Sequence, residues 1–568
     1  MRLRTRLLTS AAFAGTLIVP LVPGAPVGAA PDSADAAVAW LGTQQEADGG
    51  FEVANFAGFE TPDAIYAIAA TGQASTTWNE EDALAAVEAV TTEGGKDPLD
   101  AVDDWVDTVQ GGTDVAAKAQ QAAKVIVLVA HPLGLDETDF DPSGDTEASV
   151  DLLAALQAGA GNGSYSTLPF GGRAYAAWAL GALGETVPPA LLDGLRASQQ
   201  ANGSFHYSGD AGGSGYDSDL TASVIMGLVV GGADPTSTPV DKAVTALGLQ
   251  QRWNGEWAGA SDDGSPNSTG LVMLAAAALG SNPESACWRN RGDDRFMGVP
   301  YGSPAEAMED RQADDGHIAG PYDDFGLNTS GTSQATQGLA ASEGRSRYEG
   351  AACTVAEIGG NRRTVNALYV DLLVRLADAG GATYWTQQFD NGMRPALLAK
   401  RFTGTPEYAG RVVERLYQTY LGRSASPAER QAWTAGITAG RRLAVIVALL
   451  AGPEFFASST FEGEPTNETW AAAAFQAVFG IPADAGQIQE IVDLLEGGYS
   501  RRQVATVLLH TDEARAVIVQ DIYRQLLRRD PSNGDRTYWG NELRRGVSPE
   551  RLVTLIAGSA EYRASTQG

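Results

Sequence analysis

One short phrase recurs through the first 320 residues and constrains the fold more than any other feature of the sequence. The phrase is a glutamine, then Asp-Gly or Asn-Gly, then usually an aromatic residue. Asn-Gly and Asp-Gly favour turns because both residues tolerate positive φ. A turn that recurs after apolar helical segments indicates a repeated helical hairpin. The copies occupy residues 45–51, 157–165, 200–205, 251–257 and, in a weaker form, 312–317.

An apolar segment rich in small residues follows each copy of the phrase. A sixth hairpin, without the phrase, fits residues 81–90 followed by 115–130. Repeated hairpins bury their apolar faces only by stacking on their neighbours. We therefore predict an all-α fold in which about six hairpins, within residues 33–345, close into an α/α toroid. The expected inner helices lie at 62–70, 115–130, 173–183, 220–230, 270–279 and 333–341.

A second helical repeat fills the C-terminal part of the chain. Its unit is Leu-Tyr-x-x-Leu-Leu, then an aromatic pair such as Tyr384-Trp385, then a Pro-Glu-aromatic helix start. Four copies begin near Tyr369, Tyr417, Phe475 and Tyr523, at helical apolar spacing. We predict two tandem helical modules, 364–459 and 470–566, joined by linkers at 346–363 and 460–469. The aromatic pairs suit either sugar stacking or a helical core.

Both repeats resemble known families. The N-terminal phrase resembles the repeat of prenyltransferase β subunits and squalene–hopene cyclases, the prenyltransferase/squalene oxidase repeat. This resemblance implies a terpenoid cyclase-like α6/α6 toroid, a fold that also carries non-enzymes such as thioester domains and cobalamin carriers. The C-terminal unit resembles the bacterial domain of unknown function 4214, found on extracellular and surface proteins. That resemblance implies an all-helical module without an established chemistry.

The first 30 residues have the order of a secretory signal peptide. Arg2, Arg4 and Arg6 precede an apolar run over 7–22, and small residues follow up to Ala29 and Ala30. No later stretch has about 18 unbroken apolar residues, so we expect no transmembrane segment in the mature chain. We therefore predict a secreted protein, extracellular or on the cell surface.

Charge and cysteine content limit the partners. Residues 361–568 hold 23 of the 39 Lys+Arg and 22 of the 70 Asp+Glu, which leaves 16 and 48 for the first 360 residues. Such an acidic front half repels nucleic acid, so no nucleic-acid partner is expected. In an exported chain, Cys287 and Cys353 are expected to form one disulfide. No metal-ligand spacing is present, and we predict neither a metal nor a cofactor.

The segment from Tyr216 to Ala222 is the main candidate for chemistry. It resembles the Asp-x-Asp-Asp-Thr-Ala motif of squalene–hopene-type cyclases, which places Asp219 as proton donor and Asp217 as its neighbour. Leu220 replaces the next Asp of that motif, which removes part of the acid's environment. The simpler interpretation is that Asp217 and Asp219 cap the helix that follows.

A binding rim is the alternative use of the same turns. Closing the ring would gather polar and aromatic side chains at one end of the toroid, together with Asp63, where they suit a small amphipathic ligand or a sugar. The competing interpretation is that polar residues cap helices and aromatic residues join repeats. The expected ligand-binding residues are Tyr165, Phe205, His206, Tyr216, Asp217, Asp219, Trp253, Trp257, Asn267 and Asn328.

These observations predict a non-catalytic binding or surface-association protein. The toroid would supply a cavity for an unknown small ligand, and the C-terminal modules would attach to a cell-surface component. Five arginines of these modules offer contacts to an anionic wall polymer. The competing hypothesis is an enzyme, either a cyclase-like lyase with Asp219 as general acid or a carbohydrate-active enzyme that uses an Asp pair. The five arginines are Arg423, Arg528, Arg529, Arg544 and Arg545.

Overall fold

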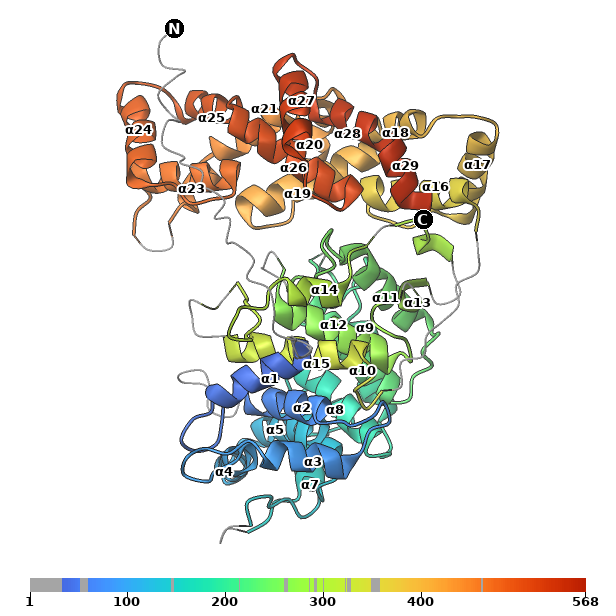
Figure 1. Ribbon diagram of the computed structural model, residues 1–568, viewed down its shortest axis with the longest axis vertical. Helices are drawn as coiled ribbons and strands as arrows, with labels where there is room; N and C mark the ends of the chain where they lie inside the picture. Colours follow the sequence, from blue (N-terminus) through green and yellow to red (C-terminus); the bar gives the residue numbers. More distant parts are fainter. Residues whose placement is uncertain are drawn as a thin grey trace, which may run out of the picture. The chain divides into compact units, whose positions relative to one another are not determined.

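The computed structural model describes residues 33–567 except 52–59, 145–147, 214, 260–263, 286, 291–293, 300, 322, 324–327, 349–357 and 461–462. Two compact units follow one another, with a boundary between Gly359 and Gly360 (Figure 1). Within the described residues the structure is helical apart from two isolated β-bridges, Phe140 with Val150 and Gln312 with Ile318. The all-α prediction is therefore confirmed.

Six helical segments, which we call the inner helices after the prediction, follow one another through the N-terminal unit, and most of their residues are buried except in the first half of α5. Each packs against the next in chain order, and α15 packs against α2, so the last segment contacts the first. Figure 1 shows α15 beside α1 and α2, although more than 250 residues separate α15 from α2. The segments are α2 (Thr61–Thr71), α5 (Val115–Val125) with the π-helix η1 (Ile126–Ala130), α8 (Phe170–Ala182), α10 (Ser218–Val230), α12 (Pro266–Ala278) and α15 (Asn328–Ser342).

The other helices of the unit pack against these six or against one another. Helix α4 (Pro98–Gln110) lies between the two halves of the predicted sixth hairpin and was not predicted. It buries Leu99, Val102 and Val106, and Asp97 caps it in a capping box with Asp100. The others are α1 (Ser33–Thr43), α3 (Glu80–Glu88), α6 (His131–Leu133), α7 (Leu152–Ala158), α9 (Pro189–Ala197), α11 (Thr238–Gln250), α13 (Cys287–Asn290), the 3₁₀ helix η2 (Asp294–Phe296) and α14 (Pro304–Glu309).

The glutamine of the recurring phrase joins neighbouring hairpins. Its Nε2 donates one hydrogen bond within its own turn and a second to a backbone carbonyl of a later segment or, for Gln312, of the first helix. Gln312 bonds Gly316 O and Ser33 O, at 2.9 and 2.8 Å, which ties the last hairpin to the first. In the copy at 200–205 this role belongs to Gln199, and in the copy at 157–165 Gln157 is exposed. The other second acceptors are Val90 O for Gln45, Pro239 O for Gln199 and Gly302 O for Gln251.

The aromatic position of the phrase ties each turn to the inner helix that follows it. Its backbone N–H donates to the hydroxyl of a threonine in or near the first turn of that helix. A threonine hydroxyl can accept a hydrogen bond. Each of these bonds therefore holds the turn against the first turns of the helix that follows. The four bonds join Phe51 to Thr61, Phe205 to Thr221, Trp257 to Thr269 and Ile318 to Thr332, at 3.0–3.1 Å.

Small residues allow the inner helices to approach each other through their backbones. A Cβ atom added to Gly270 of α12 would lie 1.9 Å from the carbonyl oxygen of Gln334 in α15. Between α8 and α10, a Cβ on Gly227 would lie 2.5 Å from the carbonyl oxygen of Ala174. Distances below 3 Å are steric clashes, so the Gly- and Ala-rich composition of these helices is a packing requirement.

The segment after α15 covers the C-terminal ends of inner helices. Arg345 donates to Thr71 O at the end of α2, and Arg347 donates to His131 O at 2.7 Å. The hydroxyl of Tyr348 accepts a 2.6 Å bond from Trp178 Nε1 of α8. Burial raises the pKa of Tyr348 above its usual range, so the hydroxyl stays protonated. Part of the predicted linker 346–363 therefore packs on the N-terminal unit.

The two predicted modules of the C-terminal unit pack into each other. Helix α16 contacts α29, α18 contacts α28, and α21 contacts α25. Helices from the first and last repeats are thus neighbours, as are helices from the two middle repeats. The helices are α16 (Gly360–Leu373), α17 (Ala379–Asp390), α18 (Pro395–Thr403), α19 (Pro406–Leu421), α20 (Pro427–Thr438), α21 (Arg442–Leu450), α22 (Pro453–Ala457), α23 (Asn467–Phe479), α24 (Ala485–Glu496), α25 (Arg501–Leu509), α26 (Asp512–Leu527), α27 (Asn533–Arg544), α28 (Pro549–Ala557) and α29 (Ala560–Gln567).

A repeated Tyr–Trp–Arg clamp holds the C-terminal repeats. Trp433 Nε1 donates to the hydroxyl of Tyr417 at 3.1 Å, and Arg423 lies over the Tyr417 ring, 5.0 Å from its centroid. Trp539, Tyr523 and Arg529 repeat this geometry, at 2.9 and 5.0 Å. The tryptophans of these pairs are therefore used within the fold. The tyrosines Tyr384 and Tyr538 of the predicted aromatic pairs are instead exposed, so the core interpretation does not hold for them.

Candidate ligand-binding site

The two carboxylates singled out from the sequence have different roles at the start of α10. Asp217 is buried and is the N-cap residue, where its carboxylate accepts the backbone N–H of Leu220 at 3.1 Å. Asp219 lies in the first turn, and its Oδ1 is buried. The capping interpretation therefore describes Asp217, whereas Asp219 is directed into the protein.

Three of the predicted ligand-binding aromatic residues pack in the hydrophobic core. Tyr165, Phe205 and Trp257 are at most 1% exposed. Phe205 stacks on Phe170, and the indole Nε1 of Trp257 donates to Leu247 O at 2.8 Å. Their rings thus have structural partners inside the unit.

The remaining predicted residues lie nearer the surface. His206, Tyr216 and Trp253 are half-buried, and His206 packs on the exposed ring of Tyr207 at 4.2 Å between centroids. Asn267 and Asn328 are half-buried in the first turns of α12 and α15. The structure leaves these five side chains on the turns and helix starts where the sequence placed them.

A polar cluster lies where α2, α5 and α15 meet. Lys124 Nζ of α5 forms an ion pair with Asp63 Oδ2 of α2 at 2.8 Å. From α15, Gln334 Nε2 donates to Asp63 Oδ1 at 3.1 Å, and Gln337 Nε2 donates to Asp63 O at 2.9 Å. The side chain of Asp63 is 4% exposed and that of Lys124 is 17% exposed. Charges this deeply buried require such partners, because desolvation is costly.

Tyr175 extends this cluster to α8 and α10. Burial raises the pKa of its hydroxyl above the usual range, and the charges of Asp63 and then Asp219 raise it further. The phenol is therefore a neutral hydrogen-bond donor near two carboxylates. We call Asp63, Lys124, Tyr175, Asp219, Gln334 and Gln337 the Asp63 cluster. Five inner segments contribute to it.

The Asp63 cluster gathers hydrogen-bonding groups of both kinds. It contains an ammonium group, two amides and a phenol as donors, and two carboxylates as acceptors, and the ammonium and both amides already bond to Asp63. Lys124, Tyr175, Asp219 and Gln334 are partly exposed, so solvent reaches the cluster. Sequence analysis identified Asp63 and Asp219 but missed Lys124, Tyr175, Gln334 and Gln337. No distinct signal marked Lys124, Gln334 or Gln337, because α5 and α15 carry several other polar residues.

Three further predictions concern a disulfide, a metal site and a membrane span. Cys353, and with it the predicted disulfide to Cys287, lies outside the described residues. Within the residues that are described, no group of three or more His, Cys, Asp or Glu side chains is placed to hold a metal ion. The described helices also include none with the length and apolarity needed to cross a bilayer.

Comparison with known proteins gave no match: no protein-family model, no curated protein and no solved structure is similar to this chain.

Proposed function

We propose that the chain is an exported, non-catalytic binding protein. Its N-terminal unit is an α/α toroid of the prenyltransferase and squalene–hopene cyclase type, and the Asp63 cluster binds its ligand. Support for the toroid comes from the order of helix contacts, in which α15 packs on α2, and from the bond between Gln312 and Ser33 O. The C-terminal repeats, which resemble the domain of unknown function 4214, attach the protein to a cell-surface component.

The observation that carries the binding proposal is the buried Asp63–Lys124 pair, held by Gln334 and Gln337 from the other end of the unit's sequence. A buried ion pair often adds little stability over a well-packed apolar pair, and we attribute the presence of this pair to ligand binding. The segment that ends in Tyr348 covers the C-terminal ends of inner helices, so the ligand enters from their N-terminal ends. The cluster contains both hydrogen-bond donors and acceptors, and a sugar or a zwitterion offers the complementary groups.

One observation favours the enzyme hypothesis as a second candidate. A buried carboxylate oxygen of Asp219 close to Tyr175 is the kind of environment in which a carboxylic acid serves as general acid. Against it, Asp217 is engaged as a helix cap and Leu220 replaces the third acid of the cyclase motif. We therefore place Asp219 in binding rather than in proton transfer.

Native mass spectrometry of the full-length secreted protein tests the proposal. We expect a small polar molecule to co-purify, or a member of a panel of sugars and zwitterions to bind. Tyr175→Phe and Gln334→Leu should each weaken that binding about tenfold, the effect of one buried hydrogen bond to a charged or polar group. Tyr207→Phe, on an exposed ring, is the matched control and should bind as the wild type does.

Two results would contradict the proposal. If no molecule co-purifies with the protein and no member of the panel binds to it, the proposed binding function is wrong. Conversion of the ligand to a product, abolished by Asp219→Asn while binding persists, would instead establish the enzyme.

A further inference from the structure

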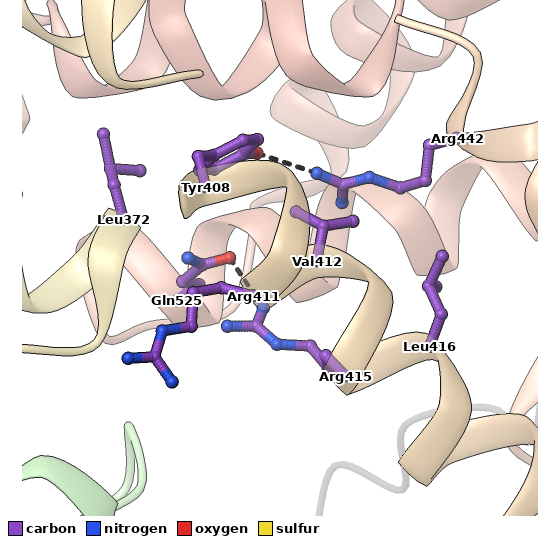
Figure 2. Close-up of a pocket in the computed structure, with 8 residues that line it drawn as sticks. All are labelled: Leu372, Tyr408, Arg411, Val412, Arg415, Leu416, Arg442 and Gln525. Carbon is purple, nitrogen blue, oxygen red and sulfur yellow. Dashed lines mark hydrogen bonds between the residues drawn. The ribbon is translucent and has the colours of Figure 1, made fainter. Parts of the chain in front are cut away.

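A small arginine-lined pocket lies in the C-terminal unit, apart from the Asp63 cluster. Its cavity of about 30 Å³ opens on one face of α19, where positions 408, 411, 412, 415 and 416 recur at helical spacing. Figure 2 shows Arg411 and Arg415 extending from α19, with Arg442 reaching in from α21. The lining residues are Leu372, Tyr408, Arg411, Val412, Arg415, Leu416, Arg442 and Gln525.

The arginines proposed from the sequence for anion contacts already have acidic partners within the chain. Arg442 of the pocket is also neutralised, because its Nε pairs with Glu550 Oε1 at 2.7 Å and its Nη2 donates to Tyr408. The other pairs are Arg423 with Glu429 and Glu454, Arg528 with Asp371, Arg529 with Asp535 and Glu561, Arg544 with Asp512, and Arg545 with Glu542.

Arg411 and Arg415 differ from these arginines. Among the described residues neither forms an ion pair, and Arg415 donates only to the neutral amide of Gln525, at 2.9 Å. Asp521 acts on Arg415 through its charge but does not pair with it. Two like charges at positions i and i+4 of a helix repel each other. The pocket thus carries two guanidinium charges that no ion pair neutralises, and Asp521 offsets part of the charge of Arg415.

We propose that this pocket binds a phosphate group. A phosphate monoester carries about −1.5 to −2 charges at pH 7, which can balance two guanidinium groups that lack ion-pair partners, whereas a carboxylate would balance only one. The planar fork of arginine suits phosphate oxygens, and the hydroxyl of Tyr408 lies in the same lining. A cavity of about 30 Å³ has room for roughly two water-sized groups, so it admits two of the phosphate oxygens while the rest of the ligand stays outside.

Apolar side chains on the pocket wall strengthen this site. Leu372, Val412 and Leu416 exclude water from one side, and an electrostatic interaction is stronger where water is excluded. They also offer a surface for the carbon chain of a phosphate ester. The site is independent of the Asp63 cluster and would persist if the N-terminal unit bound nothing.

Isothermal titration calorimetry of the full-length chain in a phosphate-free buffer tests the proposal. Inorganic phosphate and glycerol phosphate are expected to bind, and acetate is expected to bind at least tenfold more weakly. Arg411→Gln and Arg415→Gln should each reduce phosphate affinity about tenfold or more, as expected for a hydrogen bond to a charged group. Asp521→Asn should increase the affinity, because it removes a negative charge that opposes the anion.

Arg502→Gln is the matched control, since Arg502 is an exposed arginine of α25 that does not line the pocket. It changes the net charge equally and should leave the affinity unchanged. Lack of phosphate binding at millimolar concentration, or an equal loss in all three arginine variants, would overturn the proposal. Acetate binding as tightly as phosphate would also overturn it, in favour of a carboxylate site. Stronger binding of glycerol phosphate than of inorganic phosphate would support an ester as the source of the phosphate group.

Discussion

Replacing Lys124 with methionine is expected to lower the free energy of unfolding of the N-terminal unit by about 3–5 kcal/mol. The change removes the cation 2.8 Å from Asp63 and leaves a carboxylate that is only 4% exposed without a countercharge. The amides of Gln334 and Gln337 still donate to Asp63, but neutral donors do not replace the lost charge. Hydrogen-exchange mass spectrometry in increasing urea, read on peptides of this unit, measures the loss.

Two further variants separate charge from packing. Asp63→Asn combined with Lys124→Met should recover much of the stability, because the uncompensated charge is then absent. Lys118→Met on the same helix is the control and should change stability by less than about 0.5 kcal/mol. An equal effect of the Lys118 and Lys124 variants would show that the buried ion pair is not formed.

Replacing Gly270 with alanine is expected to destabilise the same unit by several kcal/mol, at or above the upper end of about 1–3 kcal/mol for overpacking. The added Cβ would lie 1.9 Å from Gln334 O and 2.5 Å from Gln334 C, both backbone atoms of α15. Backbone of a packed helix cannot rotate away as a side chain would, so α12 and α15 must separate. Since Gln334 and Gln337 reach Asp63 from α15, ligand affinity should fall as well.

Gly194→Ala in α9 is the matched control for this substitution. A Cβ at Gly194 meets nothing within 4 Å, and alanine is a better helix former than glycine by about 1 kcal/mol. The control should therefore be neutral or slightly stabilising in the same urea experiment. Equal stability of the Gly270 and Gly194 variants would mean that α12 and α15 do not make this close approach.

The helical class and the hairpin repeats were predictable because their signals are local. Asn-Gly and Asp-Gly turns repeat at visible intervals, and the small-residue segments match helices within a few residues, as 220–230 matches α10. The role of the phrase was also partly predictable. The aromatic residue does join its turn to the fold, although the threonine that accepts its N–H lies 10 to 16 residues later in sequence.

Other features depend on contacts that sequence periodicity does not encode. Helix α4 carries four aspartates, and their density hid an apolar face of Leu99, Val102 and Val106. In the Asp63 cluster, Lys124 resembled an ordinary surface lysine until α5 was packed between α2 and α8. Contacts between distant segments are equally absent from the sequence pattern of the C-terminal repeats.

Within those repeats, sequence spacing identified the four copies but could not show which copies pack together. The contact of α18 with α28 joins residues about 150 positions apart. Likewise, the sequence does not distinguish an arginine that forms an ion pair from one that does not. Only the positions of Glu454 and Glu561 show that Arg423 and Arg529 are neutralised while Arg415 is not.

The account depends most on the meeting of the first and last inner helices, and a double-mutant cycle between Asp63 and Gln334 tests this directly. The two residues are 271 positions apart, and Gln334 Nε2 donates to the side-chain Oδ1 of Asp63 at 3.1 Å. With Asp63→Ala, Gln334→Ala and the double variant, we predict a coupling free energy of at least about 0.5 kcal/mol, as for residues in contact. A parallel cycle of Gln334→Ala with Asp151→Ala, which removes the cap of α7, should be additive. Additivity within about 0.3 kcal/mol for the Asp63 cycle would contradict the account.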